Sequence, residues 1–175
     1  MNKEEIPEEL PILTLRNNAL FPGVVIPITV GRDKSIKLIE DAYAKDKTIG
    51  VVSQIKAEIE EPTIDDLHKV GTVAHIIKKL KMPDGSTTII IQGKRRFEIE
   101  SFIQEKPYFR AVVKGLAETK LDMTVVKNMA LLDSMKEMAL KIIKDSPNIP
   151  SEASFAIKNI ESPTFLVNFI ASNLS

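Results

Sequence analysis

The chain has 175 residues, of which 43% are hydrophobic and 27% charged, and its 24 basic and 24 acidic side chains leave no net charge. This composition is typical of a globular protein, and the balanced charge argues against a dedicated nucleic-acid binder, which needs a basic excess. No apolar run reaches the ~18 residues of a membrane span, and the start MNKEEIPEEL lacks the apolar core of a signal peptide. Cysteine is absent, which excludes disulfides and cysteine-based zinc sites. We expect a cytoplasmic protein.

Residues 9–117 are expected to form a β-rich domain. Turn residues separate short runs of alternating or β-branched apolar residues, the pattern of strands in a compact sheet. The clearest hairpin is centred on Pro83-Asp84-Gly85, which suits a tight turn. The seven predicted strands cover residues 10–15, 25–30, 49–54, 70–80, 86–92, 95–102 and 109–114. Their number and spacing predict a compact barrel or sandwich.

One helix is predicted between the second and third strands, in GRDKSIKLIEDAYAKDK. Apolar residues recur on one of its faces, namely Ile36, Ile39, Ala42 and Tyr43. Asp33 is the expected N-cap. A short helical turn is also expected where Thr63 and Asp66 resemble a capping box.

Residues 118–175 are predicted to be helical. The segment LDMTVVKNMALLDSMKEMALKIIKD contains no Gly or Pro, and its apolar residues recur at helical spacing. A second helix is expected after a Ser151 cap, and a third from Ser162-Pro163 onward. The chain stops at Ser175 without a helix cap, which we interpret as a fragment boundary. The sequence thus predicts an α+β protein: a flexible acidic tail over 1–8, a β domain over 9–117, and the truncated start of a helical subdomain over 118–175.

The segment LRNNALFPGVVIPITV, residues 15–30, carries more apolar side chains than a surface connection requires. A first group alternates along two strands, and at least half of its members are expected in the core: Leu13, Leu15, Ile26, Ile28 and Val30. A second group remains around Gly23 as candidate contact residues: Leu20, Phe21, Pro22, Val24 and Val25. Core and contact site both remain open for this second group, with burial under the nearby helix favoured for Phe21.

No catalytic, cofactor or metal site is expected. His68 and His75 match no zinc spacing, and Thr88 stands where a phosphate loop leading to Gly93-Lys94 needs its first glycine. Six basic residues are expected to face one another across the hairpin region: Lys78, Lys79, Lys81, Lys94, Arg95 and Arg96. They support nucleic-acid binding as an alternative, although a lysine-protected sheet edge is favoured because interleaved aromatic residues are missing.

Three stretches together resemble the Lon ATP-dependent protease family. They are LPILTLRNNALFPGVVIPITVGRDKSIKLIEDA, DDLHKVGTVAHIIKKLKMPDGSTTIIIQGKRRFEI and FLVNFIASNL, in the order that the family shows. Met82 stands where Leu is commoner in the family, and Asn17-Asn18 follow Arg16 where an acidic residue is common. The resemblance spans residues 9–175.

This resemblance implies a PUA-like β domain followed by the start of the helical N-terminal region of a bacterial Lon protease. Members of the family form hexamers that unfold proteins with an ATPase module, which uses ATP and Mg, and cleave them with a Ser-Lys dyad. Neither module is in this chain, so no enzyme activity and no cofactor is expected for it. The implied role is quality control: binding unfolded, damaged or abnormal proteins, presenting them to the ring and aiding hexamer assembly. The implied partners are these substrates, the other domains of the chain and neighbouring subunits, with no membrane.

Overall fold

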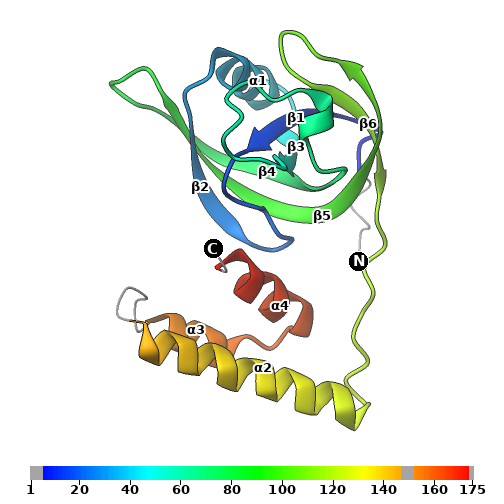
Figure 1. Ribbon diagram of the computed structural model, residues 1–175, viewed down its shortest axis with the longest axis vertical. Helices are drawn as coiled ribbons and strands as arrows, with labels where there is room; N and C mark the ends of the chain where they lie inside the picture. The colour runs from blue at the N-terminus through cyan, green and yellow to red at the C-terminus, as the bar shows by residue number, and fades with distance from the viewer. Residues whose placement is uncertain (1–5, 147–151, 174–175) are drawn as a thin grey trace. The chain divides into compact units, whose positions relative to one another are not determined.

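A computed structural model describes residues 6–146 and 152–173. The chain divides into two compact units, the first ending at Ala117 and the second beginning at Glu118 (Figure 1). The first unit contains all the strands that the structure describes and the second is helical, so each is treated separately below.

The first unit is a mixed sheet of six strands, in the order β2-β5-β4-β3-β1-β6. Their bounds are β1 Glu9–Leu15, β2 Val25–Val30, β3 Thr48–Ser53, β4 Val70–Lys81, β5 Thr87–Gln104 and β6 Arg110–Gly115. β1 and β3 are parallel, and the other pairs are antiparallel. Because β6 also pairs with β5, five strands close into a ring, and β2 is added outside it. The α+β prediction is confirmed, but the sheet is not a regular barrel.

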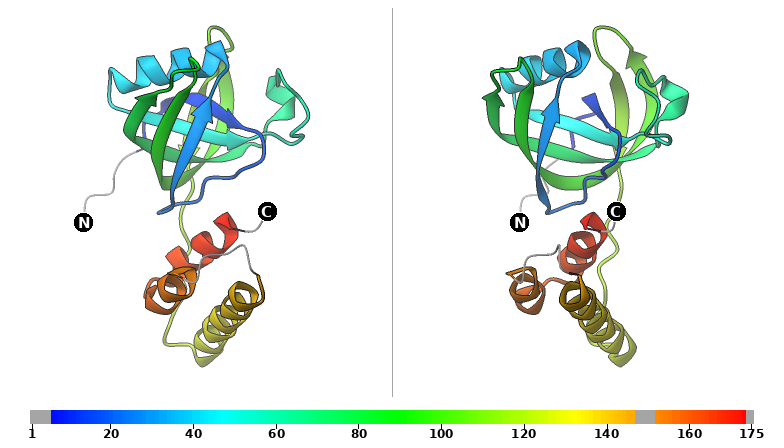
Figure 2. Two further views of the ribbon diagram at one scale, coloured as in Figure 1. Left: turned by 90° about the vertical axis from the view of Figure 1, so that its left-hand side faces the viewer. Right: turned by 60° about the vertical axis from the view of Figure 1, so that its left-hand side comes forward.

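β5 corrects the predicted strand count, because the expected strands 86–92 and 95–102 are one strand of 18 residues. Its first part, Thr87–Gln92, pairs with β2, and its last part, Phe97–Gln104, pairs with β6. β4 pairs with the first two thirds of β5 on the opposite edge. Figure 2 shows β2 beside the first part of β5, with helix α1 (Asp33–Tyr43) across one end of the strands. One long strand therefore serves three partners.

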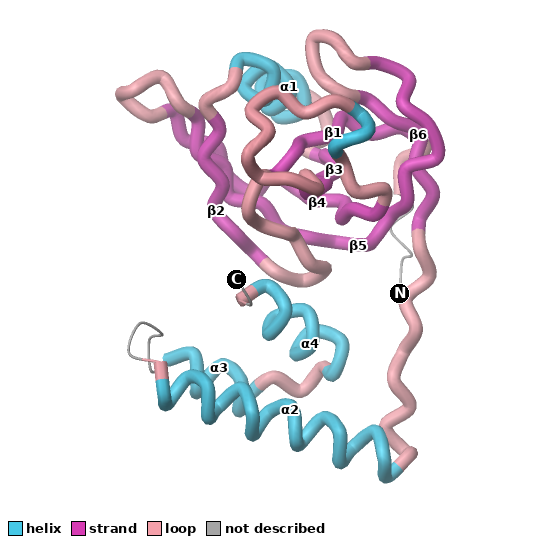
Figure 3. The backbone as a smooth tube through the Cα atoms, in the orientation of Figure 1, coloured by secondary structure: helices cyan, strands magenta, loops and turns pink. Residues whose placement is uncertain are grey.

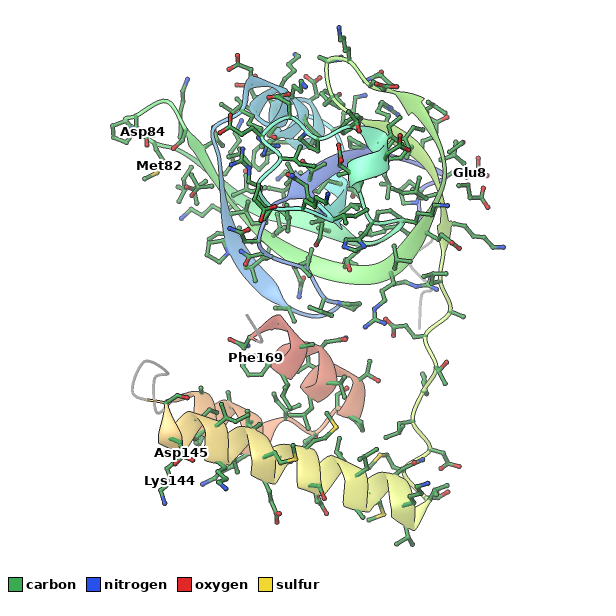
Figure 4. All side chains as sticks on the ribbon, in the orientation of Figure 1. Glu8, Met82, Asp84, Lys144, Asp145 and Phe169 are labelled. Atoms are coloured by element: carbon green, nitrogen blue, oxygen red, sulfur yellow. The ribbon has the colours of Figure 1, made fainter. Side chains whose placement is uncertain are left out.

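The predicted hairpin turn is confirmed between β4 and β5. Gly85 has a φ of 86°, and the Met82 amide donates to the Ser86 carbonyl at 2.9 Å. Asp84 accepts hydrogen bonds from the Ser86 amide at 2.9 Å and from its hydroxyl at 2.6 Å. Figure 4 shows Met82 and Asp84 at the tip of this hairpin, beyond the body of the sheet.

The β unit has two hydrophobic clusters. The first lies under α1 and includes Leu38, Ile39, Ile89 and Ile91, and the second includes Phe97 and Ile99 of the same strand β5. Ile6 packs against the second cluster, and the Glu8 carbonyl accepts a hydrogen bond from the Val113 amide at 2.8 Å. The last residues of the predicted tail are thus in contact with the sheet, and residues 1–5 lie outside the described residues.

The predicted N-cap of α1 is wrong, whereas the predicted capping box at residues 63–66 is confirmed. α1 begins at Asp33, so Asp33 lies in the first turn and Arg32 is the N-cap, without a side-chain cap bond. The capping box of Thr63 and Asp66 is present at the 3₁₀ turn η1, Ile64–Asp66. α1 is also bonded to the connection between β5 and β6, because the Tyr108 hydroxyl donates to Asp41 Oδ2 at 3.0 Å.

The second unit contains α2 (Val126–Asp145), α3 (Glu152–Asn159) and α4 (Pro163–Ser172), drawn as helices in Figure 3. Its core is a cluster with one or two residues from each helix, namely Leu132, Ala139, Ile157 and Leu166. α4 starts at Ser162-Pro163 as predicted, and Ser162 is its N-cap, since the Ser162 side chain accepts a hydrogen bond from the Phe165 amide at 3.2 Å. The predicted cap at Ser151 lies outside the described residues. No described helix combines the length and apolar character needed to cross a bilayer.

Candidate functional site

The apolar connection that precedes β2 is held against the sheet by its backbone. The Thr72 hydroxyl of β4 donates a 2.6 Å hydrogen bond to the Leu20 carbonyl in a buried position. The Gly23 amide donates to the Gly93 carbonyl, and the Gly93 amide donates to the Val24 carbonyl, both at 2.9 Å. The Val24 amide closes a turn onto the Phe21 carbonyl at 3.2 Å, and Gly23 supplies its φ of 81°. The connection therefore continues the pairing of β2 with β5.

Burial separates the five predicted contact residues. Leu20 and Val24 are only 7% and 6% exposed, and Pro22 is also buried. Phe21 is half-buried, whereas Val25 is 49% exposed. In this structure only Phe21 and Val25 can be reached by another molecule, so a contact role can apply to these two alone.

The alternating strand residues behave as predicted. Leu13, Leu15 and Val30 are buried in the first cluster, and Ile26 and Ile28 pack against it partly buried. Most of the apolar content of residues 15–30 is therefore core.

Val25 belongs to an exposed apolar face that sequence patterns did not reveal. Strand register places Pro27 of β2 opposite Ile90 of β5, in the row beside that of Val25. Ile89 and Ile91 are buried in the core, so alternation turns Ile90 to the outside. Pro27 is exposed, and Ile90 is half-buried.

β4 extends this face. Its register shifts between Ile76 and Lys78, so that Ile77 and Lys78 together oppose Ile90 as a β-bulge. Ile77 is 50% exposed, and Leu80, which pairs with Thr88, is 41% exposed. We call the five side chains that share this part of the sheet the outer apolar face: Val25, Pro27, Ile77, Leu80 and Ile90.

The basic residues of the hairpin do not gather as expected. Lys79 is opposite Ile89, whereas Arg96 is opposite Thr72, seven residues further along β5. At ~3.3 Å per residue, Lys79 and Arg96 are about 23 Å apart along the strand. Lys79 lies over the Tyr43 ring at 5.0 Å, where Lys47 also lies at 4.7 Å. The expected face-to-face arrangement of the two basic groups across the hairpin is therefore wrong, because the register places Lys78 and Lys79 opposite Ile90 and Ile89 instead.

Metal-binding groups do not cluster in the described part of the chain. No three His, Asp or Glu side chains there are arranged to hold a metal ion. His75 borders a depression of about 310 Å³ near Lys94 and Arg95, whereas His68 is not among its lining residues.

Sequence reasoning missed the outer apolar face for a definite reason. Pro27, Ile77 and Ile90 lie in three different strands, and only the register across β2, β5 and β4 brings them together. The available signal was Pro27 itself, because proline inside a strand indicates a sheet edge.

Comparisons with known proteins agree on one family. Residues 9–175 match the model of the ATP-dependent protease La (LON) substrate-binding domain. A Lon protease of Flavobacterium johnsoniae is 61% identical over the whole of this chain, which covers 21% of that protein. A Lon protease of Cytophaga hutchinsonii is 54% identical over the whole of this chain, which covers 22% of that protein. The chain thus spans about a fifth of the length of these relatives.

Solved structures show the same fold. The N-terminal domain of Mycobacterium avium complex Lon protease matches with a TM-score of 0.74 and 20% identity, over 95% of this chain and 84% of that one. A Lon N-terminal domain protein from Xanthomonas campestris matches with a TM-score of 0.57 and 16% identity, over 95% of this chain and 99% of that one.

Proposed function

Because this chain belongs to the family of Lon substrate-binding domains, we propose that its outer apolar face binds exposed hydrophobic segments of unfolded or damaged proteins. The observation that carries this proposal is the row of accessible apolar side chains over β2, β5 and β4, of which Val25, Ile77 and Leu80 are 49%, 50% and 41% exposed. Phe21, at the turn before β2, offers a further half-buried aromatic ring.

The size of the face predicts weak binding at a single site. Burial of apolar surface stabilises a complex by ~25 cal/mol per Å², and association and ordering costs offset much of this gain. A few partly exposed side chains therefore support micromolar rather than nanomolar affinity. Low affinity suits a site that must accept many sequences and release them.

We propose that the rest of the longer protein supplies the other activities. In this proposal the ATPase module, with ATP and Mg, and a Ser-Lys protease module lie outside the chain described here. Assembly into a hexamer in the cytoplasm would display several copies of the outer apolar face, and multivalent display raises the apparent affinity for a long unfolded chain.

Binding of a permanently unfolded protein tests the proposal. Reduced, carboxymethylated α-lactalbumin labelled with a fluorophore is titrated with this chain, and anisotropy is recorded. The double variant Val25→Ser and Leu80→Ser should bind at least fivefold more weakly, because it removes two exposed large apolar side chains of the face, one from β2 and one from β4.

Ile55→Ser is the matched control, since Ile55 is 54% exposed but lies outside the outer apolar face. It should bind like the unmodified chain. Equal loss in both variants, or no loss in the double variant with an unchanged circular dichroism spectrum, would contradict the proposal.

A further inference from the structure

The edge of β2 that faces away from β5 has no strand partner among the described residues. A groove of about 490 Å³ runs along it, lined by residues 14–18 on one side and 27–32 on the other, together with Ser35. Leu15 and Val30, which are buried in the first core cluster, contribute to its lining. The groove therefore combines an unpaired strand edge with a partly apolar floor.

The backbone of this edge is available for pairing. The Val24 carbonyl points toward β5, because it accepts from the Gly93 amide. Successive peptide groups of a strand alternate between its two edges, so those of Val25, Pro27 and Thr29 point away from β5. Pro27 has no amide hydrogen and fits the unpaired edge, where no partner is lost. The free edge thus offers the Thr29 and Val25 amides and three carbonyl oxygens.

Two arginines line the groove near the end of β2. Arg32 follows that strand, and Arg16 follows β1. Both arginines line the same groove, and the pKa of Arg32 is lowered first by burial and then by the positive charge of Arg16, so the two charges oppose each other. Glu61 and Glu60 act on the pKa of Arg32 in the opposite direction, although Glu61 is engaged by Lys34 in a salt bridge.

Neither arginine has a described carboxylate within ion-pair distance. The Arg32 side chain donates a long hydrogen bond of 3.4 Å from Nη2 to Gln54 Oε1. A carboxylate placed between the two groups would relieve their repulsion and accept charge-assisted hydrogen bonds from both.

We propose that this groove binds an extended peptide segment that adds a strand to the free edge of β2 and places one Asp or Glu side chain between Arg16 and Arg32. This inference rests on the proposed function and names the segments that the domain prefers. Main-chain hydrogen bonds to β2 make the pairing tolerant of sequence, and the arginine pair selects an acidic residue at one position.

Peptide binding measures this preference. The probes are fluorescein-labelled octapeptides of alternating valine and serine, acetylated and amidated so that a side chain supplies the carboxylate. A glutamate stands at position 2 in one peptide and at position 7 in another, to cover both strand directions, and the controls carry glutamine. At least one glutamate peptide should bind about tenfold more tightly than its glutamine counterpart.

Protein variants assign the preference to the groove. Arg16→Gln should reduce it, and the double variant with Arg32→Gln should abolish it. Lys114→Gln removes one positive charge from an exposed position on β6 and should leave the preference intact.

Thr29→Pro removes an amide from the free edge of β2 and should weaken binding of the glutamate and glutamine peptides alike, at least fivefold. Thr29→Val keeps the amide but loses the Thr29–Thr88 hydroxyl contact, and should not weaken peptide binding.

N-methylation of alternate peptide amides gives an independent test of strand addition that leaves the protein unchanged, and it should also weaken binding. Equal binding of glutamate and glutamine peptides, or a preference that survives the double arginine variant, overturns the proposal. Tight binding of a glutamine peptide with a free C-terminal carboxylate overturns the assignment to a side chain.

The groove proposal can fail separately from the proposed function. If the peptides show no preference while carboxymethylated α-lactalbumin still binds through Val25 and Leu80, only the groove proposal is wrong. If neither ligand binds, the proposed function is wrong as well.

Discussion

Phe21 and Gly93 are in backbone contact: a Cβ atom on Gly93 would lie 2.2 Å from the Phe21 carbonyl oxygen. This closeness explains why a strand as long as β5 contains a glycine near its middle. It also explains how the connection before β2 reaches the sheet closely enough to exchange hydrogen bonds with it.

Replacing Gly93 by alanine should destabilise the β unit by about 2 kcal/mol or more, because the neighbour to be displaced is backbone rather than a flexible side chain. Gly31→Ala is the matched control, since a Cβ there meets nothing within 4 Å. Urea unfolding followed by circular dichroism measures both. A Gly93→Ala protein as stable as Gly31→Ala would show that the contact is not tight in solution.

Thr72→Val should cost about 1–3 kcal/mol of unfolding free energy, because it leaves the buried Leu20 carbonyl without its 2.6 Å hydrogen bond. Valine keeps the shape of threonine, so packing changes little. Thr29→Val removes an exposed hydroxyl pair instead and should change stability by less than about 0.5 kcal/mol. Similar losses in the two variants would refute the special role of the Thr72 bond.

Tyr108→Phe should raise the pKa of Asp41. That pKa is held below its ordinary value first by the hydrogen bond from Lys37 and then by the one from Tyr108, so it should rise without reaching the ordinary value. Carboxyl carbon shifts in an NMR titration report it. Asp66, whose pKa is lowered by Thr63, should not change.

The same substitution affects stability at both ends of the pH range. A lowered carboxyl pKa contributes stability that is present above the ordinary pKa and is lost as pH falls through the pKa of the folded state. The Asp41 pKa is lowered less in the variant, so the variant should lose less unfolding free energy in acid than the unmodified chain. Burial and then Asp41 raise the pKa of Tyr108. The stability that this raised pKa contributes is present below the ordinary tyrosine pKa and is lost as pH rises above it. Phenylalanine does not ionise, so the Tyr108→Phe variant should not show this loss of stability at alkaline pH. An unchanged Asp41 titration would exclude the hydrogen bond.

Ser162→Ala should loosen the start of α4 by about 1 kcal/mol, since the Phe165 amide loses its cap. Amides of the first turn should then exchange with solvent about fivefold faster. Ser172→Ala, at the other end of the helix, removes a bond to the Phe169 carbonyl and should leave the first turn unchanged.

The sequence predicted correctly those turns and caps that depend on residues close together in the chain. Gly85 and Asp84 specify the β4–β5 turn, and Thr63 with Asp66 specifies a capping box. The predicted strands 86–92 and 95–102 leave out Gly93, which in the structure lies inside the continuous strand β5 and admits the Phe21 carbonyl. That contact joins residues 72 positions apart, so no local pattern could show it.

The candidate surfaces depended even more on long-range pairing. Val25 alone of the predicted contact residues is well exposed, because backbone bonds to β4 and β5 draw Leu20 and Val24 inward. Arg16 and Arg32 line the same groove only because of the path of β1, β2 and the connection between them.

The ring of strands can close only after β6 has been synthesised, long after β1. Leu10 of β1 pairs with Ala111 of β6, about 100 residues later in the chain. At ~5–20 residues per second, a ribosome needs about 5–20 s to make the intervening segment. Leu10, which is 1% exposed in the folded domain, has no β6 to cover it during that interval. While it is being made, this chain therefore carries an uncovered apolar segment of the kind that it is proposed to bind.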